Sequence, residues 1–181
     1  VGVLVGYVSS SFIVLLIFLA SQDGVRAYMM WGMGSFSGVP HTMLPVFTIS
    51  IILSLIVPIL LAKPLNLLVL GNKYAENLGV GIRTVRNALL LASGTLTAIV
   101  TTFCGPIAFI GLAVPHMTRL VFKTDDFRIL IPAVMLCGAA TALVCNAVCV
   151  LPGDGGVIPL NVVTPLIGVP VILYIMLKKY F

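Results

Sequence analysis

The sequence predicts an all-α integral membrane protein, a polytopic helical bundle of about six transmembrane helices with two short cytoplasmic helices. The first observation is composition: 60% of the 181 residues are hydrophobic and 8% are charged, and the mean hydropathy is +1.22. Soluble domains are about 25% charged and could not cover this much apolar surface. The second observation is that the apolar residues form long runs. The third is that the basic residues are distributed unevenly between those runs.

Six apolar runs reach or approach the length of about 20 residues that a helix needs to cross a bilayer. The weakest run, residues 106–122, is short, contains two prolines and carries His116 and Arg119. Proline is tolerated in a membrane helix where neighbouring groups satisfy the backbone, and an arginine near the end of a run can extend to the interface. The predicted spans are residues 1–20, 43–62, 87–104, 106–122, 129–151 and 159–177.

The basic residues predict the orientation of these spans. If all six are real, nine of the ten lysines and arginines fall on one side and only Arg26 falls on the other. Basic residues concentrate in cytoplasmic loops, so that side and the C-terminus are predicted to be cytoplasmic. If residues 106–122 merely dip into the membrane and return, three of the nine move outside. The nine are Lys63, Lys73, Arg83, Arg86, Arg119, Lys123, Arg128, Lys178 and Lys179.

A charged, glycine-rich island at residues 71–86 interrupts the apolar sequence. Asn72 is a plausible N-cap for a short helix over residues 73–78, and Gly79 suits its left-handed end. Tyr74 and Leu78 are four residues apart and would form an apolar edge on that helix. Residues 82–86 begin a second helix that runs into the next span. The island is either a docking element for a cytoplasmic partner or a solvated connecting loop.

The last span has four prolines in or just before it, which suggests an irregular backbone. A helix broken at Pro159 and again near Thr164–Pro165 would leave backbone groups free, and such groups persist only where they face protein or a watery cavity. Asn161 and Thr164 are the polar residues at the break. The candidate lining of a translocation pathway is therefore Pro159, Asn161, Thr164 and Pro165. Proline kinks between packed helices are the alternative.

Other chemistry is sparse. The sequence has no G-x-x-x-x-G-K-[ST] motif, so it does not bind ATP through a P-loop. Its four cysteines have no histidine or carboxylate at metal-ligand spacing, so no metal site and no resident cofactor are expected. No nucleophile, base and orienting group fall together, which argues against an enzyme. The net charge is +5, but the basic residues do not form a patch with interleaved aromatic residues, as a nucleic-acid site would. The absence of carboxylates within the spans counts against an ion-coupled carrier.

Five stretches of the sequence resemble one known family in order and spacing. They read "MMWGMGSFSGV", "AKPLNLLVLGNKYAENLGV", "GPIAFIGLAVPHMTRLVF", "TDDFRILIPAVMLCGAA" and "IPLNVVTPLIGVPVILYIMLKK". Together they closely resemble the FecCD family, the permease subunits of ABC importers for ferric siderophores, haem and vitamin B12. The resemblance covers essentially all of residues 1–181, as a single permease domain. Members have ten spans, so the chain looks like the last six. The start at Val1, inside an apolar run and without methionine, agrees with a missing N-terminal part.

The resemblance implies roles for specific residues. The loop at residues 71–86 would hold two coupling helices that dock on the ATPase subunit, and residues 158–168 would form a short broken helix that lines the pathway on the outer side. The docking residues would be Tyr74, Ala75, Glu76, Leu78, Gly79, Val80 and Gly81. The stretch around the weakest span is one of those that resemble the family. It supplies the structural motif residues Gly105, Pro106, Gly111, Pro115, His116 and Arg119.

The resemblance also implies the setting. Such permeases lie in the cytoplasmic (inner) membrane of bacteria or archaea and work as dimers, with a second copy or a homologous permease. They pair with ABC ATPase subunits, which bind ATP and Mg²⁺, and with a periplasmic or lipid-anchored substrate-binding protein. A ferric siderophore is favoured as cargo because it is the commonest in the family; haem and vitamin B12 are alternatives. An ion-coupled secondary transporter or channel is the alternative class.

Overall fold

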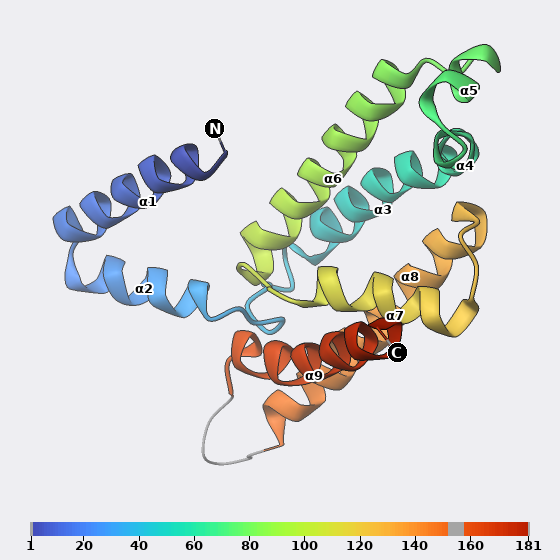
Figure 1. Cartoon of the computed structure of the whole chain (residues 1–181). Helices are drawn as coiled ribbons and strands as arrows, with labels where there is room; N and C mark the ends of the chain where they lie inside the picture. The colour runs from blue at the N-terminus through green and yellow to red at the C-terminus, as the bar shows by residue number, and fades with distance from the viewer. Residues whose placement is uncertain (1, 152–157, 181) are drawn as a thin grey trace.

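The structure, a computed structural model, describes residues 2–151 and 158–180. These residues form helices joined by short connections, with no strand among them (Figure 1), so the all-α prediction is confirmed. The helices are α1 (Gly2–Leu19), α2 (Gln22–Gly32), α3 (Leu44–Leu60), α4 (Ala62–Val69), α5 (Asn72–Asn77), α6 (Ile82–Cys104), α7 (Ile110–Phe122), α8 (Phe127–Val150) and α9 (Leu160–Tyr180).

Fewer helices than six meet a strict test of length and composition for crossing a membrane. Helices α1, α6 and α8 pass, and α3 with α4 passes as one bent pair, which gives three or four spans among the described residues. Helix α7 has 13 residues, so at 1.5 Å per residue it is about 20 Å long, against a hydrocarbon core of about 30 Å. The predicted span over residues 106–122 is therefore a shorter helix preceded by irregular backbone.

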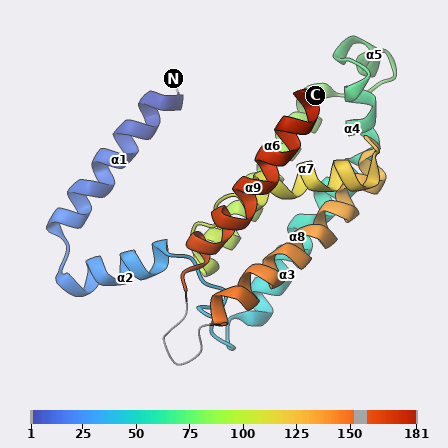
Figure 2. The ribbon, with the colours of Figure 1, turned by 60° about the horizontal axis from the view of Figure 1, so that its bottom comes forward.

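The helices pack in two groups that meet along α8. Helix α3 packs against α6, and α7 packs against α8 and α9. Helix α8 also contacts α3 and α4, so it connects the two groups. Figures 1 and 2 show α1 and α2 to one side of these helices, and α1 has no buried residue. The apolar side chains of α1 are consequently available to lipid or to other helices.

The bend of 42° between α3 and α4 has an identifiable cause. Pro64 lies in the first turn of α4 and has no N–H to donate to the Leu60 carbonyl, which an uninterrupted helix would require. The helical hydrogen bonds resume on either side, from the Leu61 N–H to Val57 and from the Leu65 N–H to Leu61. Helix α4 is thereby directed away from the line of α3.

Helix α2 was not predicted, because polar residues break the hydrophobic pattern between residues 21 and 42. Its start is nevertheless encoded locally. The Ser21 hydroxyl accepts a hydrogen bond of 3.3 Å from the Gly24 N–H, and Asp23 lies in the first turn. A serine N-cap followed by an acidic residue favours a helix start through hydrogen bonding and the helix dipole. This signature, rather than apolar periodicity, was the available signal.

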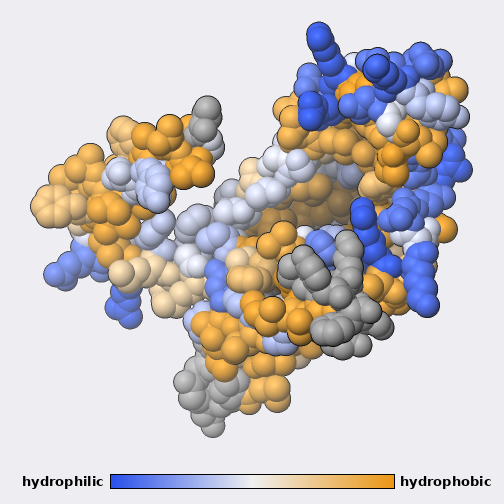
Figure 3. Space-filling view, in the orientation of Figure 1, coloured by the Kyte–Doolittle hydropathy of each residue, from blue (hydrophilic) through white to orange (hydrophobic). Residues whose placement is uncertain are grey.

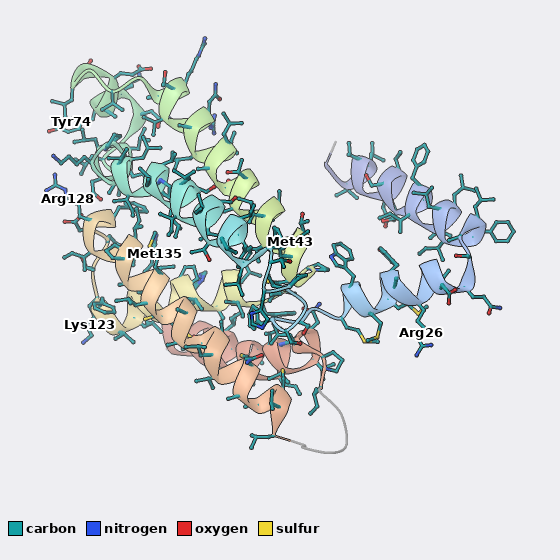
Figure 4. The ribbon with its side chains drawn as sticks, turned by 180° about the vertical axis from the view of Figure 1, so that it is seen from behind. Arg26, Met43, Tyr74, Lys123, Arg128 and Met135 are labelled. Carbon is teal, nitrogen blue, oxygen red and sulfur yellow. The ribbon has the colours of Figure 1, made fainter. Side chains whose placement is uncertain are left out.

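The surface agrees with a membrane location. In Figure 3 apolar residues cover most of the visible helix sides, whereas hydrophilic residues gather at the end that Figure 1 assigns to α4 and α5. Figure 4 places Tyr74, Arg128 and Lys123 along one edge of the molecule and Arg26 on the opposite side. This separation matches the uneven distribution of basic residues in the sequence. The side chains of Lys178 and Lys179 lie outside the described residues.

Candidate functional sites at the two ends of the bundle

Helix α5 forms the centre of the island, and its ends are fixed by backbone turns. Gly71 precedes it with φ of 118°, and Gly79 follows it with φ of 81°. The Gly79 N–H donates to Glu76 (2.9 Å) and the Val80 N–H donates to Ala75 (3.0 Å), which is the Schellman arrangement for a helix end. The predicted left-handed stop at Gly79 is confirmed. Asn72 is the first helical residue rather than the N-cap, and no side chain caps this helix.

The island presents an apolar edge to the outside. The Tyr74 and Leu78 side chains are 53% and 54% exposed, and Glu76 is exposed beside them. Figure 4 shows Tyr74 at the extremity of the molecule. Ala75 differs from expectation: it is fully buried, so it packs inside the island and cannot contact a partner. An exposed apolar pair on a fixed turn is the kind of surface that docks.

The prediction that residues 82–86 begin a helix that runs into the next span is confirmed, because they are the first residues of α6, which continues to Cys104. The island therefore holds one separate short helix, α5, and not the two that the resemblance implies. Another short helix is α4 (Ala62–Val69), which the sequence analysis did not predict because it lies almost wholly beyond the predicted span over residues 43–62. Gly81 precedes α6 with φ of −72°, a value open to any residue, so it is not a glycine-dependent joint.

Helix α4, which leads into the island, is joined to the start of α8 by polar side chains that the sequence analysis missed. The Asn66 amide donates to the Asp126 carboxylate (2.5 Å), and its oxygen accepts from the Phe127 N–H (2.8 Å). Asp126 also accepts from the Arg128 N–H (2.9 Å) and is the N-cap of α8. These hydrogen bonds, first from Arg128 and then from Asn66, hold the pKa of Asp126 below its usual value.

The opposite end of the bundle contains a junction of three segments, residues 31–35, 104–109 and 158–161. Asn161 lies at its centre: its amide donates to the carbonyls of Gly32 (3.0 Å) and Pro106 (2.6 Å), and its oxygen accepts from the Ala108 N–H (3.2 Å). The backbone N–H of Asn161 donates to Met33. The Asn161 amide therefore ties these segments together, and its place in a translocation pathway stays a prediction.

Gly105 is required by the geometry of the same junction. Its φ is 79°, and a Cβ atom there would overlap the carbonyl oxygen of Trp31. Trp31 is held in place by a hydrogen bond from its indole N–H to Thr101 (3.1 Å), and the Ser35 N–H donates to Cys104 (2.9 Å). Only glycine combines this φ with so close a backbone approach.

The proline-rich segment is less broken than predicted. Pro159 precedes the helix, as expected, but α9 runs without interruption through Pro165 and Pro170. The predicted second break, and with it a separate short helix over residues 158–168, is therefore wrong. Pro165 still removes the N–H that would bond the Asn161 carbonyl.

Two cavities adjoin this segment. One of about 280 Å³ lies between α7, α8 and α9 and is lined almost wholly by apolar atoms. Thr164 lines it and is 2% exposed, and its hydroxyl has no hydrogen-bond partner among the described residues. The other, of about 420 Å³, lies at the junction between α2, α8 and α9. Its described lining includes Pro159, Ser35 and Asn146 and no charged side chain.

The remaining motif residues, His116, Arg119, Pro115 and Gly111, all lie on α7. The His116 Nδ1 lies 2.9 Å from the Leu112 carbonyl one turn earlier, on the exposed side of α7. Arg119 pairs with Asp125 at 3.7 Å with both side chains largely exposed, so this ion pair contributes little. Pro115 lies inside α7, and Gly111 has no atom within 4 Å of a would-be Cβ. Within the described part of the chain, no three His, Cys, Asp or Glu side chains gather as metal ligands.

The comparisons with known proteins agree with this arrangement. The sequence model described as the FecCD transport family matches residues 1–178. The chain belongs to the FecCD transport family. The vitamin B12 import system permease proteins BtuC of Salmonella typhi and of Salmonella newport (strain SL254) are each 33% identical to it over 183 aligned residues. The alignments cover 98% of this chain and 54% of each relative, so the chain spans about half the length of these FecCD relatives.

One solved structure shares the fold of this FecCD chain. It is described as an inward-facing conformation of an ABC transporter assigned to the metal-chelate type, and it superposes with a TM-score of 0.90 at 29% identity. The match covers 98% of this chain and 57% of that chain. The membership predicted from sequence is thus confirmed, and the helical arrangement is the one found in a transporter.

Proposed function

We propose that this chain is part of the membrane-spanning permease subunit of a binding-protein-dependent ABC importer. The observation that supports this most strongly is family membership over residues 1–178, together with the exposed apolar edge of α5. The chain has no P-loop motif, so ATP and Mg²⁺ bind to a partner ATPase, and this subunit itself catalyses no reaction.

The island is the docking element for that ATPase. Its support is the exposure of Tyr74 and Leu78 on a helix whose end is fixed by Gly79. A small apolar edge on a rigid turn can enter a groove with little loss of conformational entropy. Basic residues concentrate at this end, which makes it the cytoplasmic one, with the C-terminus on the same side. The protein then lies in a bacterial or archaeal cytoplasmic membrane, as a dimer that receives cargo from an external binding protein.

The cargo is a metal–organic complex, with a ferric siderophore as the first candidate. The cavity of about 420 Å³ has described lining from thioethers, hydroxyls, an amide and apolar groups, without a charged side chain. A bare divalent cation would require carboxylate or imidazole ligands, whereas a complex that carries its own ligands does not. Vitamin B12 is the second candidate, because relatives at 33% identity are vitamin B12 permeases. Haem is a third member of the same class.

The test is uptake by the full-length protein with its ATPase and binding protein in proteoliposomes. The set of radiolabelled complexes contains a ferric siderophore, haem and cyanocobalamin. We expect one of them to be taken up, and we expect this uptake to require ATP and Mg²⁺ on the side of the membrane where the ATPase is bound. Uptake driven by a proton or sodium gradient without ATP would instead indicate the alternative class, an ion-coupled carrier.

A further inference from the structure

The hydrogen bonds between α4 and α8 form a closed polar connection, which we call the α4–α8 clamp and define as Asn66, Asp126 and the Phe127 N–H. Asn66 uses both ends of its amide: the nitrogen donates to the Asp126 carboxylate and the oxygen accepts from Phe127. The Asp126 backbone is held in turn, because its N–H donates to the Thr124 hydroxyl (3.2 Å). Two bonds from one side chain to one turn fix orientation as well as distance.

On the island side, the clamp holds a helix that is not rigidly continuous with the span before it. The 42° bend at the α3–α4 boundary separates α4 from α3. Past its other end, α4 packs against α5, and the N–H of Gly71, the N-cap of α5, donates to the Leu68 carbonyl in α4 (3.1 Å). Helices α4 and α5 are therefore one small unit, and the clamp fixes how this unit is oriented relative to the rest of the bundle.

On the other side, α8 reaches from the clamp to both cavities. It has 24 residues, so it is about 36 Å long. Cys145 near its far end lines the cavity of about 280 Å³, and Asn146 and Cys149 line that of about 420 Å³. Helix α8 also contacts α3, α4, α7 and α9. A displacement of its first turn would thus reach both cavities along one element.

We propose that Asn66 and Asp126 are positioning residues that transmit movement of the α4–α5 unit to α8. This inference rests on the proposed function, because the movement would come from a bound ATPase. The hydrogen bonds of the clamp involve neither Tyr74 nor Leu78, so a substitution in the clamp leaves both side chains of the docking edge in place. Its role is coupling of hydrolysis to transport, not attachment of the ATPase.

The two side chains allow a swap experiment. Asn66→Asp sets two carboxylates against each other and removes the donated hydrogen bond. Asp126→Asn keeps the clamp, since the new amide oxygen can accept from both the Asn66 amide and the Arg128 N–H. The double variant Asn66→Asp/Asp126→Asn restores the two bonds of the clamp with the roles of the side chains reversed: the amide at position 126 donates to the carboxylate at position 66, which still accepts from Phe127. The Arg128 N–H, which bonds the same Asp126 oxygen as the Asn66 amide does, loses its acceptor in this variant.

The measurement is cargo transported per ATP hydrolysed, with the full transporter in proteoliposomes and with bound ATPase quantified for each variant. We expect Asn66→Asp to lower this ratio about tenfold with ATPase binding retained, Asp126→Asn to change it less than about twofold, and the double variant to recover most of the loss. If Asn66→Asp fails to fold, the double variant decides: rescue of folding together with a ratio close to that of Asp126→Asn supports the pairing, and a double variant that stays unfolded or has a ratio well below that of Asp126→Asn contradicts it.

A wild-type ratio in Asn66→Asp, or a double variant as defective as Asn66→Asp, would overturn the clamp. Loss of bound ATPase in Asn66→Asp would also contradict it, because that result assigns the residues to docking. The failure of the proposed function looks different: the wild-type protein itself would show no ATP-driven uptake, and the coupling role would fall with it.

Discussion

The two ends of the bundle use polar groups in opposite ways. At the junction, the Asn161 amide is turned inward and bonds three backbone groups from segments more than 50 residues away in the sequence. At the island, the turns are made by backbone hydrogen bonds within a few residues, and the side chains of Tyr74 and Leu78 are left exposed. One end is built to hold irregular backbone in place, and the other is built to present a surface.

This difference indicates where substitutions should act. Changes at the junction should affect folding first, because its polar groups are structural. Changes on the island should affect partner binding and coupling while the fold remains. The predictions below test that division in the full-length protein.

The largest effect is expected at Gly105. Gly105→Ala introduces a Cβ that overlaps the Trp31 carbonyl and that disfavours φ of 79°, so we expect destabilisation of about 3 kcal/mol or more. The matched control is Gly111→Ala in α7, where the added Cβ meets nothing within 4 Å. Thermal unfolding of purified protein in detergent should show a large drop for the first variant only. Equal unfolding midpoints for both would show that the junction is not tightly built.

A second contrast compares two polar residues of the last helix. Asn161→Ala removes three hydrogen bonds and leaves the Gly32 and Pro106 carbonyls without this partner, so we expect a loss of about 2–4 kcal/mol. Thr164→Val removes a buried hydroxyl that has no partner among the described residues, so stability should stay within about 0.5 kcal/mol or rise. Thermal unfolding of the two purified variants in detergent measures this difference in stability. A Thr164→Val variant as unstable as Asn161→Ala would contradict this assignment.

A smaller, local effect is expected at the end of α5. Gly79→Val forces a β-branched residue to φ of 81°, at a cost of about 1–2 kcal/mol, although no neighbouring atom obstructs it. We expect the ATPase to stay partly bound while transport per ATP falls. Gly81→Ala is the control, because φ there is −72°. If the two variants transport equally well, the angle of the island does not matter.

The smallest effect is expected in how the stability of the fold depends on acidic pH. Because the folded-state pKa of Asp126 lies below its usual value of about 3.9, its ionised form contributes stability at neutral pH, and this contribution is lost as pH falls through the folded pKa. Asp126→Asn should therefore flatten the fall in unfolding midpoint on acidification below about pH 4. Parallel curves for wild type and variant would mean that the Asp126 hydrogen bonds do not stabilise the fold.

Local features of the sequence were predictable, and long-range ones were not. The left-handed end at Gly79 follows from glycine placed after a short helix, and the family follows from motifs that run in order along the chain. By contrast, the partners of Asn161 and the Asn66–Asp126 pair are 53 to 129 residues apart. Nothing in a single sequence joins them. Lys123 and Arg128 lie close to Asp126 in the sequence, so local charge balance is the nearer explanation that the sequence alone offers for this carboxylate.

The predicted break in the last helix was wrong for a related reason. Prolines at 159 and 165 have the same chemistry, yet only the first lies outside the helix. Helix α9 continues through Pro165 because packing against α7 and α8 compensates for one missing hydrogen bond. Proline identifies where a helix is weakened, and the tertiary contacts decide whether it breaks.

The most direct test of the central claim is whether the exposed edge of α5 binds an ATPase. Leu78→Asp would place a carboxylate in an apolar groove and remove a contact in which a buried leucine is worth about 1.5–3 kcal/mol. Glu76→Gln, an exposed change on the same helix, is the control. We predict that the ATPase co-purified per permease falls at least tenfold for Leu78→Asp and is unchanged for Glu76→Gln, with both permeases equally folded. Full ATPase binding and full uptake in Leu78→Asp would show that the island is only a connecting loop.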